Sequence, residues 1–252
     1  MEVIRELLAG LLGTRITWTL VAGVLGAVIA LSLARAGDRP GWRARLSAIA
    51  EALGALAFQL SGFLLPTLLI LATGWASLRR RALTWRSVGL ARPPSWRRAL
   101  GIGAAAGAFE FLATTYLLEP LIGTFTGSRP DASLLAPMVG NASLLVGWLA
   151  LAWTLGAFGE EMAFQGCLLN RVAGLSGSRF RYLPALAFTG IVFGLGHSYQ
   201  GVSGMISTGL GNVFSGVLYL WMGRNLWASI VAHGVVDTLG ILMIFLGRYP
   251  GM

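Results

Sequence analysis

The chain has 252 residues, of which 56% are hydrophobic and 12% charged, and its mean hydropathy is +0.72. This composition excludes an ordinary water-soluble domain and predicts an all-α, polytopic membrane protein. Every basic residue is an arginine and the net charge is +9. We interpret these arginines as loop anchors facing anionic lipid headgroups rather than as a nucleic-acid-binding face. The single cysteine, Cys167, excludes an internal disulfide and is interpreted as a small buried residue.

Residues 1–15 show an amphipathic pattern, with leucines at helical spacing, before the first long apolar stretch. An alternative interpretation is a long signal sequence that ends at "LARAG" (33–37). Apolar stretches of about 20 residues are long enough to span a bilayer. They fall near residues 16–34, 49–77, 99–122, 141–165, 183–199, 203–222 and 226–246. About seven transmembrane helices are therefore expected. Gly62 and Pro66 favour a kink or break in the second stretch, so the range is six to eight.

The distribution of arginines predicts the orientation of the bundle. With the N-terminus inside, the inner segments contain thirteen arginines and the outer segments contain six. This bias favours a cytoplasmic N-terminus, although the arginine-rich loop at 35–48 opposes it. We divide the chain into an N-terminal region (1–97) and a catalytic helix bundle (98–252). The N-terminal region comprises the amphipathic segment, two membrane helices and an arginine-rich cytosolic loop.

Two pairs of small residues have the spacing of one helix face. Gly103 and Gly107 are one turn apart, and Gly209 and Gly216 are two turns apart. Such pairs let helix backbones approach closely, so they predict tight helix contacts but no chemistry.

Few ionisable residues lie inside the apolar stretches, where each one needs a partner or water. Counting from the "GLSGSRFR" turn places Glu160 and His197 at a matching depth, about 21 to 23 Å from the same end of two antiparallel helices. In "HGVVD", His233 and Asp237 lie one turn apart on one face. We expect these four side chains to meet, with the ring of Phe193 walling one side of His197. The set of intramembrane ionisable residues is Glu110, Glu160, Glu161, His197, His233 and Asp237.

One glutamate, two histidines and one aspartate at a shared depth suit hydrolysis. A desolvated carboxylate at Glu160, beside Glu161, can take a proton from water while His197 orients that water. His233 can donate a hydrogen bond to the oxyanion that forms on a scissile carbonyl. Asp237 is either protonated and donates as well, or accepts from His233 and fixes the tautomer of that ring.

The same four side chains, Glu160, His197, His233 and Asp237, are also a plausible ligand set for catalytic zinc. The chain lacks the HExxH spacing of the common zinc peptidases. We therefore expect catalysis without a metal or another cofactor, with zinc as the alternative.

Three motifs occur in order on successive apolar stretches: "EEMAFQG" (160–166), "FGLGH" (193–197) and "HGVVD" (233–237). They resemble the motifs EExxxR, FxxxH and HxxxN or HxxxD of the CPBP family, the type II CaaX prenyl proteases and bacteriocin-processing enzymes. The resemblance covers roughly residues 98–247. It implies a glutamate-dependent intramembrane peptidase in which Glu160 and His197 activate water.

The resemblance further implies that His233 and Asp237 stabilise the oxyanion and that Glu161 is a supporting acid. The substrate would be a membrane-associated peptide or protein, lipid-associated in part of the family. An arginine-only basic set is typical of GC-rich genomes, so we expect a bacterial cytoplasmic membrane protein with no nucleic-acid partner.

One position departs from the family motif, because Gln165 stands where the motif has arginine. Glutamine can donate a hydrogen bond but cannot neutralise a charge. We therefore expect either a protonated Glu161 or a compensating Arg171 that reaches in from the helix end. The departure also supports an alternative function, a non-proteolytic family member that acts as a membrane immunity or scaffold protein. A third hypothesis is a proton-coupled transporter with Glu110 and Asn212 as pathway residues.

Overall fold

The computed structural model describes residues 15–34, 41–61 and 66–250, and every regular element in these ranges is helical. The all-α polytopic class is thereby confirmed. The N-terminal helices are α2 (Arg15–Leu33), α3 (Trp42–Leu60), α4 (Pro66–Arg80) and the short η1 (Trp85–Val88). A continuous stretch follows, made of α5 (Trp96–Ala113), η2 (Thr114–Leu118) and α6 (Glu119–Thr126). The remaining elements are η3 (Ser133–Met138), α7 (Ala142–Leu151), η4 (Ala152–Glu160), η5 (Met162–Leu169), α8 (Asn170–Ala173), α9 (Tyr182–Gly196), η6 (Ser198–Gln200), α10 (Gly201–Trp221) and α11 (Trp227–Phe245).

The described helices differ in how well they suit a bilayer. Three are long and apolar enough to cross a membrane, namely Trp96–Thr126, Ala142–Ala173 and Trp227–Phe245. Thr19–Leu33 and Tyr182–Gly196 are shorter apolar helices. The predicted stretch at 141–165 is part of one long helix, Ala142–Ala173, which carries Glu160. These helices identify a membrane protein, and the amphipathic pattern predicted for residues 1–15 lies almost wholly outside the described residues.

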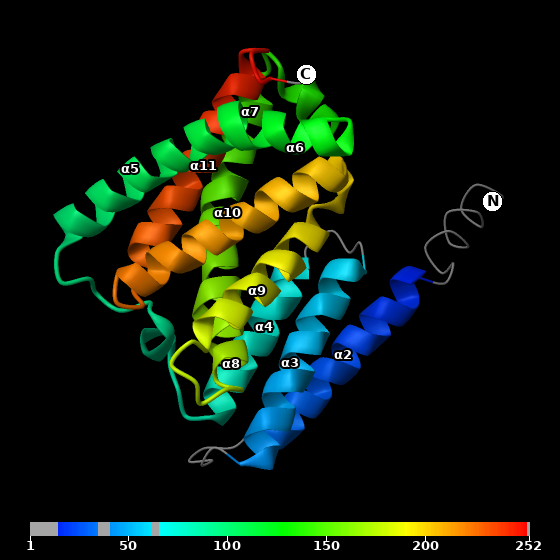
Figure 1. Ribbon diagram of the computed structural model, residues 1–252, viewed down its shortest axis with the longest axis vertical. Helices are drawn as coiled ribbons and strands as arrows, with labels where there is room; N and C mark the ends of the chain where they lie inside the picture. Colours follow the sequence, from blue (N-terminus) through cyan, green and yellow to red (C-terminus); the bar gives the residue numbers. More distant parts are fainter. Residues whose placement is uncertain (1–14, 35–40, 62–65, 251–252) are drawn as a thin grey trace.

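The stretch predicted as one span at 49–77 is two helices, α3 and α4. Pro66 is the first residue of α4, a position where its missing N–H costs nothing. The side chain of Ser77, near the end of α4, donates to Glu51 in the first half of α3 at 2.9 Å. The chain therefore doubles back, and the start of α3 and the end of α4 lie together at the lower side of Figure 1. With this extra crossing, the end of α2, the start of α3 and the end of α4 lie on the same side.

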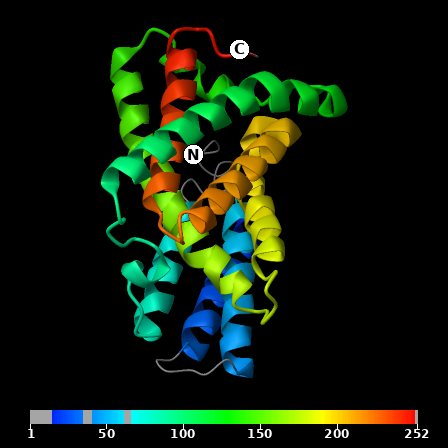
Figure 2. The ribbon, with the colours of Figure 1, turned by 60° about the vertical axis from the view of Figure 1, so that its left-hand side comes forward.

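The glycine pairs make the tight contacts that their spacing predicts. A Cβ on Gly107 of α5 would lie 2.3 Å from the carbonyl oxygen of Ala232 in α11, and one on Gly103 would lie 2.6 Å from that of Ala228. Gly209 of α10 packs in the same way against Gly190 of α9. Figure 2 shows α5 crossing in front of α11 at this contact. Because no side chain separates the backbones, α11 has a fixed position against α5.

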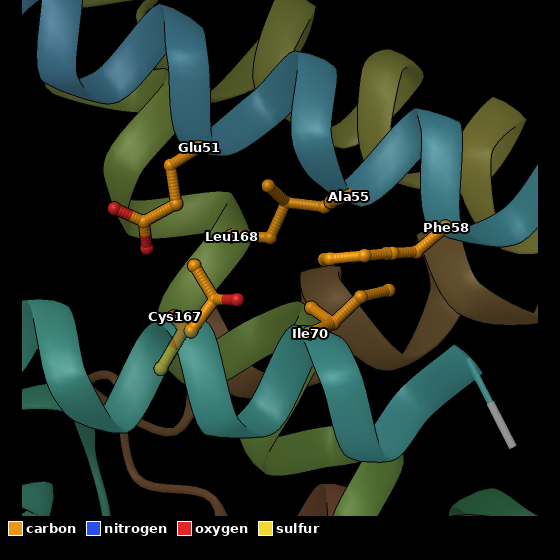
Figure 3. Close-up of a pocket in the computed structure, with 7 residues that line it drawn as sticks. Glu51, Ala55, Phe58, Ile70, Cys167 and Leu168 are labelled. Carbon is orange, nitrogen blue, oxygen red and sulfur yellow. The ribbon is translucent and has the colours of Figure 1, made fainter. Parts of the chain in front are cut away.

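A buried ion pair joins α3 to the end of the long helix. Arg171 of α8 donates to Glu51 at 2.7 Å and to the hydroxyl of Ser47 at 2.8 Å. Beside the pair is a cavity of about 10 Å³, enough for one water molecule at most. Figure 3 shows Glu51 entering this gap from α3, with Cys167 and Leu168 on its other side. Cys167 is buried and unoxidised, and the group has the character of a packed structural contact.

Candidate active site

The predicted residues of the first and third motifs meet around the imidazole of His233 on α11. Its Nδ1 lies 3.0 Å from Oε1 of Glu161. Its Nε2 lies 3.8 Å from Oε2 of Glu160 and 3.7 Å from Oδ2 of Asp237. Three carboxyl groups from two helices therefore surround one ring. Asp237 is held against the long helix as well, since a Cβ on Gly156 would lie 3.0 Å from its Oδ2.

Hydrogen bonds fix the orientation of His233. A carboxylate can only accept, so Nδ1 of the ring donates to Glu161. Glu161 is only 2% exposed, and its Oε1 also accepts from the hydroxyl of Ser215 on α10 at 2.8 Å. The residue that sets the tautomer of His233 is thus Glu161. Asp237, to which the sequence argument offered that role, faces the opposite nitrogen beyond hydrogen-bond distance.

Glu160 has a different environment from its neighbour. Its Oε1 accepts a hydrogen bond of 3.2 Å from Thr67 on α4, and its Oε2 points toward His233. Whereas Glu161 is anchored by a short bond from each of two residues, Glu160 is partly exposed and more loosely held. The two adjacent carboxyl groups are therefore distinct, one fixed and one available.

His197 lies at the end of α9 rather than inside a helix. The helix ends at Gly196, and Nδ1 of His197 donates to the carbonyl of Phe193 at 2.9 Å, which leaves Nε2 free to accept. The ring of Phe193 lies 4.6 Å from that of His197 and 6.3 Å from that of His233. Phe193 walls the imidazole as predicted. Within the described residues, however, His197 makes no ion pair with Glu160 within 4.0 Å, so His233 is the histidine nearest to Glu160.

All of these side chains line one cavity of about 910 Å³. Its walls come from α4, α5, α6, η4, α9, α10 and α11 and include Glu160, Glu161, His197, His233 and Asp237. The cavity extends to Asp131 and Gln200, at the ends of helices opposite to the arginine-rich segments. Its volume is in the range of binding sites for drug-sized molecules or short peptide segments.

The long helix is locally π-helical around the glutamates, in η4 and η5. A π-helix has a wider turn, and such segments often occur at functional sites. Gln165 consequently does not face Glu161. It is fully buried, and its Nε2 donates to the backbone oxygen and to Oδ1 of Asn212 on α10, at 3.2 and 2.9 Å. The side chain of Asn170 donates to the carbonyls of Gln165 and Gly166 in the π-helical segment.

The expectation that Arg171 compensates for the missing arginine is wrong. The side chain of Arg171 points away from Glu160 and Glu161 and donates to Glu51 and Ser47. It is also buried rather than protruding from the end of the helix, being only 9% exposed. The sequence argument treated the long helix alone and did not include α3, which supplies the acidic partner. The group that contacts Glu161 is instead the imidazole of His233.

The residues present were also compared with the zinc alternative. Among the described residues, no group of three or more His, Cys, Asp or Glu side chains is arranged to hold one metal ion. Nδ1 of His233 is taken by Glu161, and His197 stands apart from the three carboxyl groups. Catalysis without a metal therefore stays a prediction, with zinc as its alternative.

The fold and the cavity together define a membrane-embedded site with an available carboxyl group and two oriented imidazoles. Residues 142–239 match the family model described as type II CAAX prenyl endopeptidase, Rce1-like. This match confirms the resemblance to the CPBP family and covers all three motifs. It supports peptide-bond hydrolysis in the membrane as the general activity. No curated protein and no solved structure matches the chain.

Several residues at the site were not among those that the sequence indicated. Thr67 reaches Glu160 across 93 residues, and Ser215 reaches Glu161 across 54. Neither has a spacing that relates it to the glutamates, so only the tertiary fold identifies them. Glu119, which lines the same cavity, had a detectable signal, because it is a carboxylate inside an apolar stretch.

Proposed function

We propose that the chain is an intramembrane endopeptidase that hydrolyses a bond in a membrane-associated peptide or protein, with Glu160 as general base. The observation that carries this proposal is the ring of His233, anchored at Nδ1 by Glu161 while Nε2 lies between Glu160 and Asp237. The ring faces a cavity that also contains His197. Such a fixed ring beside an available carboxylate suits acid–base hydrolysis.

The first step is attack by water on the scissile carbonyl. In our scheme the water donates one hydrogen bond to Glu160 and the other to Nε2 of His197, which is free because Nδ1 is engaged. Both donors of the water are then used, and its lone pair is directed at the carbonyl carbon. Glu160 takes the proton as the C–O bond forms, and later delivers it to the leaving amine.

The second requirement is stabilisation of the oxyanion. His233, protonated at Nε2, donates to the oxygen as negative charge develops there. The carboxyl groups of Glu160, Glu161 and Asp237 surround the ring. Asp237 lies beside Nε2 and orients it from one side. The ring needs no rearrangement during the reaction because Glu161 already holds it.

The distribution of arginines leads us to a revised orientation. Because α3 and α4 are separate helices, the end of α2 and the start of α3 lie on one side, together with the segments between α4 and α5, between α8 and α9 and between α10 and α11. Their described arginines are Arg43, Arg45, Arg79, Arg80, Arg81, Arg86, Arg92, Arg97, Arg98, Arg171, Arg179, Arg181 and Arg224. We assign this side to the cytosol by the positive-inside rule. The start of α2 and the opening of the cavity at Asp131 then face the opposite side.

Labelling of single cysteines tests this orientation. In a Cys167→Ala background, Asp131→Cys is expected to react with a membrane-impermeant maleimide in intact cells, and Arg86→Cys only after lysis. The reverse pattern would assign the cavity opening to the cytosol and contradict this orientation.

Comparison of protein termini by mass spectrometry tests the activity. Cells with the wild-type chain and cells with Glu160→Gln are compared, and termini present only with the wild type identify substrates. Leu112→Ala, on an exposed surface of α5, is a matched control that is expected to retain every such terminus. If no terminus depends on Glu160 in correctly folded protein, the non-proteolytic alternative takes the place of this proposal.

The metal-free mechanism has a separate test with purified protein. Cleavage of a substrate found in this way is expected to persist after extended treatment with a chelator. Loss of cleavage that added zinc restores would contradict the glutamate-only mechanism while leaving the peptidase assignment intact.

A further inference from the structure

The cavity concentrates negative charge in a chain whose net charge is +9. Six of the ten acidic residues of the sequence line it. They are Glu110, Glu119, Asp131, Glu160, Glu161 and Asp237. Among the described residues, no arginine lines the cavity, and its only groups that can carry positive charge are His197 and His233. The excess of carboxyl groups is larger than the hydrolytic scheme uses, because that scheme does not involve Glu110, Glu119 or Asp131.

Glu119 is the most deeply buried of these additional carboxyl groups. It begins α6 and is only 4% exposed. Its Oε1 accepts from the hydroxyl of Tyr249 at 3.0 Å, but its Oε2 has no hydrogen-bond partner among the described residues. Arg129 is the basic residue whose charge acts on it, yet the two form no ion pair within 4.0 Å in the described structure. A buried carboxylate oxygen without a donor is unfavourable, so a partner is expected.

In the described structure, other residues that line the cavity also have buried acceptor atoms that receive no hydrogen bond. Oε1 of Gln59 and Oε2 of Glu161 are buried without a partner in the described part of the chain. Gln59 is 6% exposed and Glu161 is 2% exposed. Among the described residues that line the cavity, the one buried donor without a partner is Nδ2 of Asn212. A ligand that brings several N–H donors and a positive charge matches this deficit, as a guanidinium or ammonium group does.

The rim of the cavity adds a further negative charge. Hydrogen bonds from the backbone and side chain of Ser133 hold the pKa of Asp131 below its ordinary value. Asp131 is exposed, and its backbone N–H donates to the carbonyl of Gln200, which fixes the rim to the start of α10. An approaching cation therefore meets a charged aspartate before it reaches Glu119.

We propose that Glu119 binds a cationic group of the substrate, either the side chain of an arginine or lysine or a free N-terminal ammonium. The proposal deepens the proposed function, since it defines the class of peptide that enters the cavity. It concerns binding, so it does not depend on whether Glu160 is the base. Glu119 acts here in recognition, at the wall of the cavity, and not in the chemical step.

Equilibrium binding to paired lipopeptides tests the proposal. The full-length protein carries Glu160→Gln in every arm, so that turnover does not deplete the probe, and is held in nanodiscs. The probes are N-myristoylated nonapeptides of glycine, serine and leucine with one arginine, and the same peptides with citrulline, which is neutral and nearly isosteric. A second pair, anchored at the C-terminus, has either a free or an acetylated N-terminus and distinguishes the ammonium source. The cationic member of one pair is expected to bind about tenfold more tightly, as a charge-assisted hydrogen bond implies.

Substitutions assign this preference to Glu119. Glu119→Gln is expected to reduce the ratio of affinities to within about twofold, because a neutral amide cannot pair with the cation. Arg129→Gln removes the competing cation and is expected to maintain or raise the ratio. Tyr249→Phe keeps the carboxyl group and frees its Oε1, so it too should maintain the preference.

Two results would overturn the inference. One is equal affinity for the cationic and neutral members of both pairs, which would mean that water satisfies the lining acceptors. The other is an undiminished ratio in folded Glu119→Gln protein, or a lost ratio in folded Tyr249→Phe protein. Cleavage assays with the wild-type residue at 160 are run separately, so failure of the peptidase proposal is distinguishable from failure of cation recognition.

Discussion

Two buried groups of charged residues occur in this bundle, and they differ in how fully they are paired. Glu51 and Arg171 form a 2.7 Å ion pair with hydroxyl groups from Ser47 and Ser77 around it, and the adjoining gap is about 10 Å³. Three carboxyl groups share the single ring of His233 beside a cavity of about 910 Å³.

Buried charge has a structural role in the first group and suits a chemical role in the second. A closed ion pair beside so small a gap ties helices together and leaves no room for a substrate. An incompletely paired group next to a large cavity can exchange protons and partners, which hydrolysis requires. Burial of a charged residue is therefore a weaker indication of function than the combination of incomplete pairing and adjacent space.

The same substitution, glutamate to glutamine, is expected to have opposite effects in the two groups. Glu160→Gln is expected to lower the rate of substrate cleavage about a thousandfold, because it removes the base. Its melting temperature should stay near that of the wild type, since the one hydrogen bond to Glu160 from the described residues comes from Thr67. Glu51→Gln should show the reverse, with normal specific activity in the folded fraction and a lower melting temperature. If the two variants change the rate of cleavage and the melting temperature to the same extent, the two groups do not differ in role.

Removal of one member of the closed pair should destabilise the bundle strongly. Arg171→Met leaves Glu51 buried without its cation, and we expect a loss of about 3 to 5 kcal/mol in the free energy of unfolding. Unfolding in a mixed-micelle denaturant series measures it. The double variant Arg171→Met with Glu51→Leu removes both charges and should regain most of the loss. A double variant no more stable than the single one would mean that packing, not charge, dominates this contact.

The sequence allowed the class of fold and the chemistry-bearing residues to be predicted, for identifiable physical reasons. Helical spacing brings His233 and Asp237 onto one face, as in the structure. Depth counting paired Glu160 with His197, whereas the histidine nearest to Glu160 is His233. The pairing of Arg171 with Glu51 was not, because it spans 120 residues and depends on how the N-terminal helices dock. The direction of Gln165 was missed because the helix widens to a π-helix there, which a regular 3.6-residue turn does not anticipate.

The position of His233 also depends on the close contact between α5 and α11. Gly107→Ala places a methyl group against the carbonyl of Ala232, the residue before His233, where only 2.3 Å is available. We expect a loss of about 1 to 3 kcal/mol in stability, with a lower rate of cleavage because the ring is displaced. Gly101→Ala on the same helix is the matched control, since a Cβ there meets no atom within 4 Å. Equal behaviour of the two variants would show that the helix contact adapts without moving the site.

The smallest effect is expected from the hydroxyl that supports Glu161. Ser215→Ala removes its 2.8 Å hydrogen bond to Oε1 of Glu161, and the bond to His233 then holds that carboxyl group alone. Loss of one such bond corresponds to about 1 kcal/mol, so cleavage should slow about fivefold. Ser229→Ala is the control, because the hydroxyl of Ser229 donates to the backbone oxygen of Ser215 and touches no carboxyl group. The two variants should lose similar stability, but only Ser215→Ala should reduce the rate constant for cleavage. If Ser229→Ala slows the reaction equally, the hydroxyls act by packing, and the anchoring of Glu161 contributes nothing of its own to the orientation of His233.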